Sequence, residues 1–256
     1  MPTIFGTSIK RREDPRLITG SATYTDDITL PGMTYAVMVR SPYAHAHVKS
    51  IDTSAARSMP GVLGIFTGQD VKAAGFGDIP CAWVVPGSNT KTPPHPPLAV
   101  DTVRYVGDAV AVVVAEDRYL ARDAADAVLV DYEPLPAVVD AYQATQSGVP
   151  QLHADVPDNV DFHWTVQGGD VDSAFRDAAV VVRDRIINRR LIPNAMEPRS
   201  ALAQWNASMG EITLWSTTQN PHIARFLLSG VTGIPEHKIR VIAPEVGGGF
   251  GSKIPV

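Results

Sequence analysis

The stretch "RYVGDAVAVVVAEDRYLARDAADAVLVDYEPL" (104–135) carries the clearest structural pattern of the chain. The apolar, β-branched run at 104–116 predicts a strand, 117–128 predicts a helix, and 128–135 predicts a second strand. The helix face expected to pack on the core consists of Leu120, Ala121, Ala124 and Ala125. This order of elements is typical of a mixed α/β domain, which we expect to cover residues 1–140.

The bulk composition is that of a folded protein with a substantial core. The chain has 256 residues, 45% hydrophobic and 19% charged, which is enough for two domains of ordinary size. The net charge is −5, and the sequence lacks the general excess of basic residues typical of nucleic-acid-binding proteins, so we expect no nucleic-acid partner. The one cysteine, Cys81, can form no internal disulfide and cannot hold an iron–sulfur cluster alone. No apolar stretch approaches the roughly 18 residues of a membrane span, and we expect a cytoplasmic protein.

A change of pattern near the middle of the chain predicts a domain boundary. Residues 142–170 are polar and show little periodicity, so we expect a linker at 141–170. Strand patterns return after it, and a second domain is expected at 171–256. Its predicted strands are 178–190, 200–206, 211–219 and 237–245.

The best-defined helix of the second half follows Gln219. Asn220 suits the N-cap, Pro221 suits the first helical position, and Gly233 suits the end. The apolar stripe expected to face the core consists of Ile223, Phe226, Leu227 and Val231. One strand–helix–strand unit therefore has Gln219 at one end and a glycine-rich segment at the other.

That segment, "VGGGFGSK" (246–253), is called the glycine loop below. A phosphate loop of the Walker type fails here because Ser252 separates Gly251 from Lys253. The dinucleotide fingerprint fails because the sixth position counted from Gly247 is also Ser252. Glycines allow a positive φ and let backbone amides approach a ligand. Two alternatives remain: a tight turn around a core phenylalanine, or a loop that contacts a cofactor.

The glycine loop resembles the "GGGFGxK" loop of the molybdenum hydroxylases, the family of xanthine dehydrogenase, aldehyde oxidase and aerobic carbon monoxide dehydrogenase. Other segments resemble the N-terminal part of this family's large subunit, in the same order along almost the whole chain. They include "RREDPRLITGSATYTDDI" (11–28), "VRSPYAHAHV" (39–48), "MPGVLGIFTGQDV" (59–71), "RLIPNAMEPRSALA" (190–203) and "LWSTTQNPH" (214–222). The segment "MEPRS" is similar to the bacterial carbon monoxide dehydrogenase-like branch. Purine-hydroxylating members carry a glutamate where this chain has Ile254, which argues against a purine substrate.

The resemblance implies an α/β hammerhead domain followed by the first part of a molybdopterin-binding domain. It implies that the amide of Gln219 hydrogen-bonds the apical oxo ligand of molybdenum, a task for a donor that brings no charge. It also implies that Gly248, Gly249, Phe250 and Gly251 approach the pterin and the oxo ligand. Gln219 and Phe250 would then lie near the metal without being direct ligands. The alternative is that Gln219 only caps the helix that follows it.

The same resemblance implies the cofactors and partners. We expect a molybdenum–molybdopterin cofactor in the cytosine dinucleotide form, with [2Fe–2S] clusters and FAD on partner chains. The implied reaction oxidises a small carbonyl, N-heterocyclic or carbon monoxide-type substrate, with water as the oxygen source. The family's catalytic glutamate, and the cysteine that holds copper in carbon monoxide dehydrogenases, lie beyond residue 256. The resemblance therefore implies no catalytic residue within this chain.

The chain is expected to act with the remaining half of the molybdopterin-binding subunit, an iron–sulfur subunit and an FAD subunit. The alternative is a non-catalytic binding or assembly module derived from this family.

Overall fold

The computed structural model describes residues 5–81 and 83–254. The chain forms two compact units, and each is described by itself below. One unit consists of residues 33–191, and the other combines residues up to 32 with those from 192 onward. The proposed boundary at 141–170 stays a prediction.

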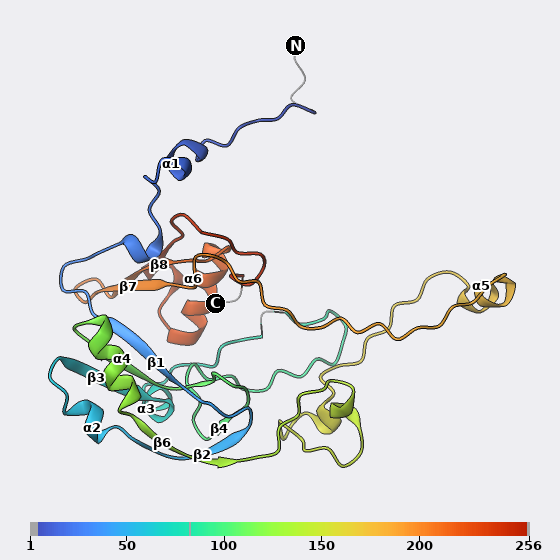
Figure 1. The fold of residues 1–256 in the computed structure, drawn as a ribbon, viewed down its shortest axis with the longest axis horizontal. Coiled ribbons are helices and arrows are strands. Elements are labelled where there is room, and N and C mark those ends of the chain that lie inside the picture. The colour runs from blue at the N-terminus through green and yellow to red at the C-terminus, as the bar shows by residue number, and fades with distance from the viewer. Residues whose placement is uncertain (1–4, 82, 255–256) are drawn as a thin grey trace. The chain divides into compact units, whose positions relative to one another are not determined.

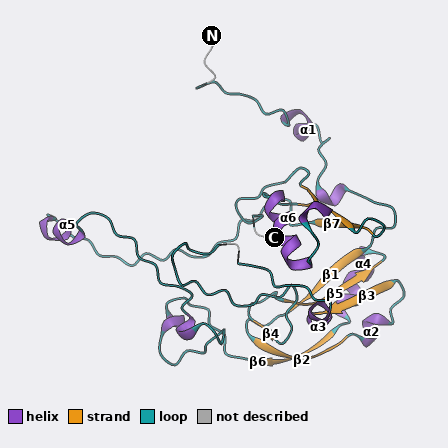
Figure 2. Ribbon diagram, turned by 180° about the vertical axis from the view of Figure 1, so that it is seen from behind, coloured by secondary structure: helices purple, strands orange, loops and turns teal. Residues whose placement is uncertain are grey.

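A three-stranded sheet lies at the centre of the 33–191 unit, in the order β1-β5-β3 (Figures 1 and 2). The middle strand, β5 (Ala109–Ala115), pairs antiparallel with both β1 (Tyr35–Arg40) and β3 (Val62–Thr67). Val110 packs in one buried cluster and Val113 in another, so β5 is covered on both faces. This explains why its sequence is continuously apolar rather than alternating.

The helix predicted after β5 is α4 (Arg118–Asp126), which contacts β1 and β5. It begins at Asp117, whose carboxylate accepts hydrogen bonds from the backbone N–H groups of the next turn. The residues buried on its inner face are Ala121, Ala124 and Ala125. The predicted face is therefore confirmed for the alanines, whereas Leu120 is only half-buried. Two shorter helices, α2 (Ser54–Arg57) and α3 (Gly68–Ala73), flank β3 along the chain.

The strand that follows α4, β6 (Leu129–Pro134), does not join the sheet of β5. It pairs antiparallel with β2 (Ala46–Asp52), which also pairs with the short β4 (Thr102–Val103). The strand–helix–strand pattern at 104–135 thus connects two sheets instead of making a parallel pair within one sheet. Ala46 and Val103 of this second sheet share a buried cluster with Val110 of β5.

The polar stretch after β6 contains two short 3₁₀ turns, η2 (Gln143–Thr145) and η3 (Pro157–Asn159). The side chain of Asn159 hydrogen-bonds to backbone groups earlier in the same stretch. Its amide nitrogen donates to the carbonyl oxygens of Ala144 and Pro150, each at 3.0 Å, and its oxygen accepts from the N–H of Leu152 at 2.9 Å. Low periodicity at 142–161 therefore reflects a loop held by side-chain hydrogen bonds rather than an open tether.

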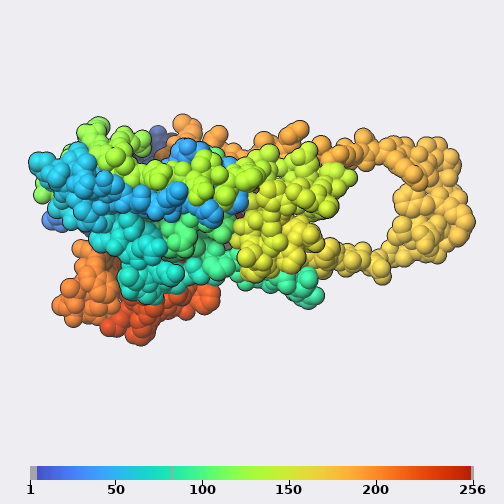
Figure 3. Space-filling view, turned by 90° about the horizontal axis from the view of Figure 1, so that it is seen from below, coloured from blue at the N-terminus to red at the C-terminus, as the bar shows by residue number. Residues whose placement is uncertain are grey.

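The strand predicted at 178–190 is not formed, which corrects that expectation. The segment from about 162 leaves the rest of its unit and carries α5 (Val171–Asp177) at its far end (Figure 1), and Figure 3 shows it as a protruding loop. Val182 and Ile186 are 82% and 89% exposed, and residues 179–190, all described, make no backbone–backbone hydrogen bond. β-Branched residues favour a strand only where a neighbouring strand satisfies the backbone, and none pairs with this segment here.

The second unit has one mixed sheet in the order β7-β8-β9. β7 (Ala201–Asn206) and β8 (Glu211–Ser216) are antiparallel, whereas β8 and β9 (Ile239–Ile242) are parallel. The crossover between the parallel strands contains α6 (Pro221–Thr232) and the 3₁₀ turn η4 (Glu236–Lys238).

The bounds of α6 confirm the predicted start and stop, but the predicted stripe is wrong in part. Gly233 ends the helix with a left-handed backbone at φ 72°. Ala224 is buried, whereas Ile223 and Phe226 are 46% and 62% exposed. Leu227 and Val231 are half-buried, so the part of the apolar stripe left uncovered by the described residues is that of Ile223 and Phe226.

Residues near the N-terminus complete this unit. After α1 (Asp14–Ile18) and η1 (Thr25–Asp27), the chain meets the segment that follows β9. The N–H of Glu245 donates to the carbonyl oxygen of Thr23 at 3.2 Å, and Arg16 forms an ion pair with the Glu245 carboxylate. Sequence periodicity did not predict this long-range contact. In the described part of the chain, no helix has both the length and the apolar character needed to cross a membrane.

The exposure of the 178–190 segment generates the first prediction. Trypsin should cut the isolated chain first at the arginines of this segment, because their backbone makes no backbone–backbone hydrogen bonds that local unfolding would have to break. Cleavage at Arg118 and Arg122 should follow much later, because α4 packs on the central sheet. A time course read by mass spectrometry checks the order. Early cuts within α4 would contradict the packing of α4 on the sheet.

Candidate functional site

Three separate segments meet at one edge of the β7-β8-β9 sheet because of the strand directions. In the parallel pair, Trp215 of β8 lies opposite Ile242 of β9, so both strands leave the sheet at the same edge. Gln219 follows β8 and the glycine loop follows β9. β7 is antiparallel to β8, so the residues just before Ala201 also lie at this edge. The sheet thus brings together Gln219, the glycine loop and Glu197.

The side chain of Gln219 contacts the glycine loop directly. Its Oε1 accepts the backbone N–H of Gly251 at 3.0 Å. The main-chain N–H of Gln219 donates separately to the carbonyl oxygen of Lys253 at 3.0 Å. An N–H group can only donate, so the carboxamide oxygen must face Gly251. The amide NH₂ is left as a donor, and no described residue accepts from it. This side chain is exposed, so the donor is available to a ligand.

Gly249 is needed for this contact. A Cβ built there would lie 2.5 Å from both Cδ and Oε1 of Gln219, closer than real side chains approach. The crowding does not come from a positive φ, since Gly248 (97°) and Gly251 (84°) are the loop glycines with left-handed backbones. Beside Gly251, a built Cβ meets nothing within 4 Å. The loop therefore combines a tight approach to Gln219 with open space next to it.

Phe250 projects from the loop and is not a core residue. It is 72% exposed, and its backbone is left-handed at φ 49°, which costs a non-glycine residue on the order of 1 kcal/mol. The N–H of Ser252 donates to the carbonyl oxygen of Gly249 at 2.9 Å, which closes a turn around the ring-bearing residue. Of the two alternatives raised by the sequence, the turn is present but the core phenylalanine is wrong.

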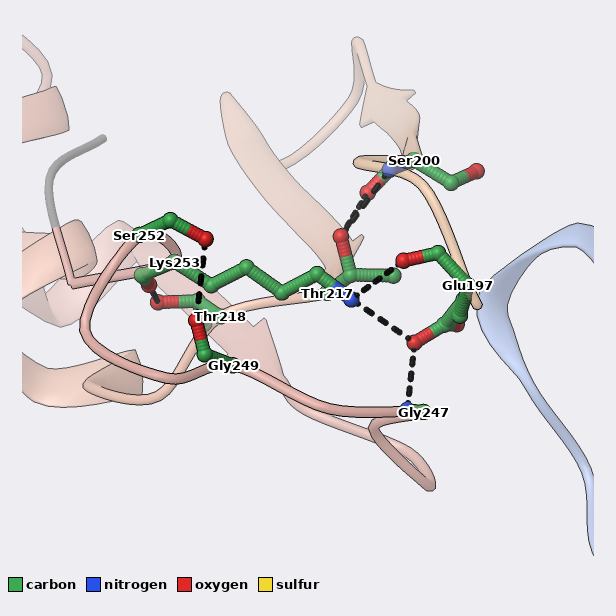
Figure 4. A network of polar contacts seen from close by, with 8 residues as sticks. All are labelled: Glu197, Ser200, Thr217, Thr218, Gly247, Gly249, Ser252 and Lys253. Atoms are coloured by element: carbon green, nitrogen blue, oxygen red, sulfur yellow. Dashed lines mark hydrogen bonds and ion pairs between the residues drawn. The ribbon is translucent and has the colours of Figure 1, made fainter. Parts of the chain in front are cut away.

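Lys253, the last residue of the loop, is enclosed and paired (Figure 4). Its side chain is 2% exposed, and its Nζ donates to Glu197 Oε2 at 3.1 Å and to the Glu197 carbonyl oxygen at 2.8 Å. A buried charge is tolerated only when it is paired, and removing one partner of such a pair typically costs about 3–5 kcal/mol. The ammonium of Lys253 therefore has a structural partner and does not reach toward a ligand.

Glu197 also holds the first end of the loop. Its Oε2 accepts the N–H of Gly247 at 2.6 Å, and a Cβ built on Gly247 would lie 2.5 Å from Glu197 Cβ. Its second oxygen, Oε1, is buried and has no hydrogen-bond partner among the described residues. The segment of Glu197 is fixed in turn by Ser200, which exchanges backbone and side-chain hydrogen bonds with Thr217 just after β8.

The donors at this edge are the neutral amide groups of Gln219 and the loop backbone, together with the exposed guanidinium of Arg199, which donates to the carbonyl oxygen of Ser252. Among the described residues, no cluster of three or more His, Cys, Asp or Glu side chains could hold a metal ion. An organic cofactor that carries hydrogen-bond acceptors would complement these donors. The donor set of Gln219 and the bare backbone beside Gly251 fit such a group.

A second concave region lies in the 33–191 unit, against the proline-rich loop at 75–100. Its volume is about 830 Å³, and its charged lining includes Lys72, Arg104 and four aspartates. Burial, together with the charge of Arg104, lowers the pKa of His153 in its wall. The mixed charges select neither an anion nor a cation, and we assign no ligand to this region.

The sequence predicted Gln219, Gly248, Gly249, Phe250 and Gly251 as site residues, and the structure places them together. It did not predict Glu197 or the partner of Lys253. A carboxylate within the largely apolar segment 191–198 was a signal of a buried pair, but its partner lies far along the sequence. Only the strand directions bring the two together.

Comparison with known proteins agrees with this geometry. The sequence profile for "Aldehyde oxidase and xanthine dehydrogenase, a/b hammerhead domain" matches residues 19–136. The profile for "Molybdopterin cofactor-binding domain" matches residues 152–256. The chain belongs to the aldehyde oxidase and xanthine dehydrogenase family, and it corresponds to the N-terminal part of that family's large subunit.

Individual relatives show the same relation. The carbon monoxide dehydrogenase large chain of Afipia carboxidovorans is 39% identical over 262 residues, which cover 97% of this chain and 31% of the relative. The nicotine 6-hydroxylase large subunit of Paenarthrobacter nicotinovorans is 40% identical over 98% of this chain and 30% of its own length. The crystal structure of quinoline 2-oxidoreductase from Pseudomonas putida 86 superimposes with a TM-score of 0.85 at 38% identity, covering 97% of this chain and 31% of that chain. The chain thus spans about a third of the length of these relatives.

The exposed, left-handed Phe250 generates the second prediction. Phe250→Gly should leave the free energy of unfolding within about 1 kcal/mol of the parent, because relief of backbone strain offsets the entropy of the added glycine. Gly251→Ala is the matched control, and the positive φ at that position should cost about 1 kcal/mol or more. Urea unfolding measures both variants. A loss of about 3 kcal/mol in Phe250→Gly would be that of a packed core ring and would contradict the exposed placement.

Proposed function

We propose that this chain is part of the molybdenum-cofactor subunit of a multi-subunit oxidoreductase. The enzyme would oxidise a small carbonyl, N-heterocyclic or carbon monoxide-type substrate, with water as the oxygen source. The proposal rests on one observation above all. In a chain that matches a molybdopterin cofactor-binding profile, the glycine loop orients the amide of Gln219 through the N–H of Gly251.

The residues of this chain would bind and orient the cofactor. The NH₂ group of Gln219 offers a neutral donor, and the backbone beside Gly251 leaves room for a ligand to approach. Gly248 contributes bare backbone, and the exposed ring of Phe250 would form one wall that limits water. Bound there, a molybdenum–molybdopterin group, in the cytosine dinucleotide form by resemblance, would supply a two-electron redox centre.

The proposed partners are the remaining portion of the molybdopterin-binding subunit, an iron–sulfur subunit with [2Fe–2S] clusters, and an FAD subunit. Two features of the chain support the first of these. Ile223 and Phe226 expose the apolar side of α6, and the segment at 178–190 has strand composition without a strand partner. Both features are what a domain would show if the rest of its core came from further sequence. A cytoplasmic location goes with this assembly.

Changes at Gln219 and Gly249 test the cofactor role in the assembled complex. Gln219→Ala should keep most of its molybdenum and lose roughly 10²-fold in turnover, a typical cost of deleting one preorganised donor at a reacting centre. Gly249→Val should lose molybdenum, because its side chain displaces Gln219 and fills the space beside it. Elemental analysis and turnover measure the two effects.

A double variant tests whether Gly249 matters because of its contact with Gln219. If Gly249 serves to accommodate Gln219, then Gly249→Ala combined with Gln219→Ala should be no worse than Gln219→Ala alone, since the crowded side chain is gone. A wild-type complex without molybdenum, or a Gly249→Val complex with full molybdenum and normal turnover, would contradict the cofactor role. The alternative function, a non-catalytic binding or assembly module, would then stand.

The partner proposal predicts how the isolated chain behaves. It should self-associate in solution and become monodisperse when it is co-expressed with the rest of the subunit, because exposed apolar surface drives association. Ile223→Ser/Phe226→Ser should reduce self-association, whereas Tyr119→Ser on α4, which is more exposed than either, should not. Light scattering after size exclusion measures the mass. A monodisperse wild-type monomer would contradict the proposal.

A further inference from the structure

We infer that Glu197 is a positioning residue for this site: it holds both ends of the glycine loop and so sets the orientation of Gln219. This inference rests on the proposed function for its consequence, but the loop geometry itself comes from contacts within this chain. Glu197 touches neither the open space beside Gly251 nor the free amide of Gln219. It would act through the loop.

Glu197 contacts the glycine loop at both of its ends. At the start, Glu197 Oε2 accepts the N–H of Gly247 at 2.6 Å, and the Glu197 N–H faces the Gly247 carbonyl oxygen at 3.4 Å. At the end, both Oε2 and the main-chain carbonyl oxygen of Glu197 accept from Lys253 Nζ (Figure 4). Glu197 therefore contacts both ends of the loop, and Arg199 adds a hydrogen bond to the carbonyl oxygen of Ser252 at its end.

Lys253 is in turn hydrogen-bonded to Gln219. The carbonyl oxygen of Lys253 accepts the N–H of Gln219 at 3.0 Å and lies 3.4 Å from the buried hydroxyl of Thr218. Within the loop, the N–H of Gly251 donates to Gln219 Oε1. Gln219 is thus held by its main chain at the end of the loop and by its side chain at the turn. A change in the position of Lys253 would alter both contacts.

The charges of the Glu197–Lys253 ion pair are both buried. The side chains of Lys253 and Glu197 are 2% and 13% exposed, so water contributes little to either charge. Glu197 Oε1 has no partner among the described residues, so Lys253 and the N–H of Gly247 are the groups that balance the carboxylate. Loss of one charge leaves the other buried and unpaired, whereas loss of both together is tolerated far better.

Removing both charges together can therefore distinguish a role of Glu197 in positioning the loop from a role in folding. In Glu197→Met/Lys253→Met both charges and the side-chain acceptor for Gly247 are lost, so the fold should survive while the loop loses its side-chain ties and keeps only main-chain contacts to residue 197. In Glu197→Gln/Lys253→Met both charges are also lost, but the carboxamide oxygen can still accept the N–H of Gly247. The two double variants differ in that one acceptor. Glu236→Gln, which removes the carboxylate of an exposed ion pair with Arg225 in the same unit, is the control.

The experiment uses the complex purified with the chains that assemble on this subunit. Hydrogen exchange at the amides of Gly247 and Gly251 reports the loop without reference to the cofactor, and elemental analysis reports molybdenum per complex. In Glu197→Met/Lys253→Met, exchange at both amides should rise about tenfold or more, the effect of one lost hydrogen bond, and molybdenum should fall. In Glu197→Gln/Lys253→Met, exchange at Gly247 and the molybdenum content should return toward wild type.

Wild-type exchange and molybdenum content in Glu197→Met/Lys253→Met would overturn the inference, because the loop would then keep its form without Glu197. Equal losses in the two double variants would also overturn it, since the acceptor would not matter. If the Met/Met variant does not purify, Glu197→Leu/Lys253→Met, which also lacks both charges and the acceptor for Gly247, takes its place with the same expected rise in exchange and fall in molybdenum. A wild-type complex without molybdenum would refute the proposed function, while the exchange data would still decide whether Glu197 holds the loop.

Discussion

Trp215 of β8 lies opposite Ile242 of β9 in a parallel pair, so the segments that follow the two strands leave the sheet at the same edge. An antiparallel register would have placed Gln219 and the glycine loop at opposite edges. The connection through α6 is what permits parallel neighbours, since such strands need a long crossover. The antiparallel β7 then delivers Glu197 to the same edge from the opposite chain direction. The site is thus a consequence of strand direction first and of side chains second.

The glycines of the loop are required for different physical reasons. Gly247 lies against Glu197 and Gly249 lies against Gln219, and neither position has room for a Cβ. Gly248 and Gly251 instead have left-handed backbones, a conformation that costs other residues free energy. A sequence pattern shows all four simply as glycine. It cannot show which of them faces a side chain and which of them turns the chain.

The sequence was sufficient where structure depends on local pattern. The strand at β5, the alanine face of α4, and the start and stop of α6 follow from periodicity and capping residues, and the structure confirms them. The site residues followed from a motif, because no local rule connects Gln219 to Gly251. The ion pair of Glu197 with Lys253 could not be predicted, because the two residues lie far apart in sequence and meet only through the sheet.

The two failures of the periodicity argument have a common cause. Ile223 and Phe226 form a regular apolar stripe, and residues 178–190 have the composition of a strand, yet both are exposed in this chain. Periodicity records the surroundings that a sequence is suited to, whereas exposure records the surroundings that this chain alone provides. Where the two disagree at neighbouring residues of a stripe, or over a whole strand-like segment, the difference marks a surface suited to further packing. This chain spans about a third of the relatives' length. In the proposed assembly, the remaining part of the subunit would cover α6 and pair with 178–190.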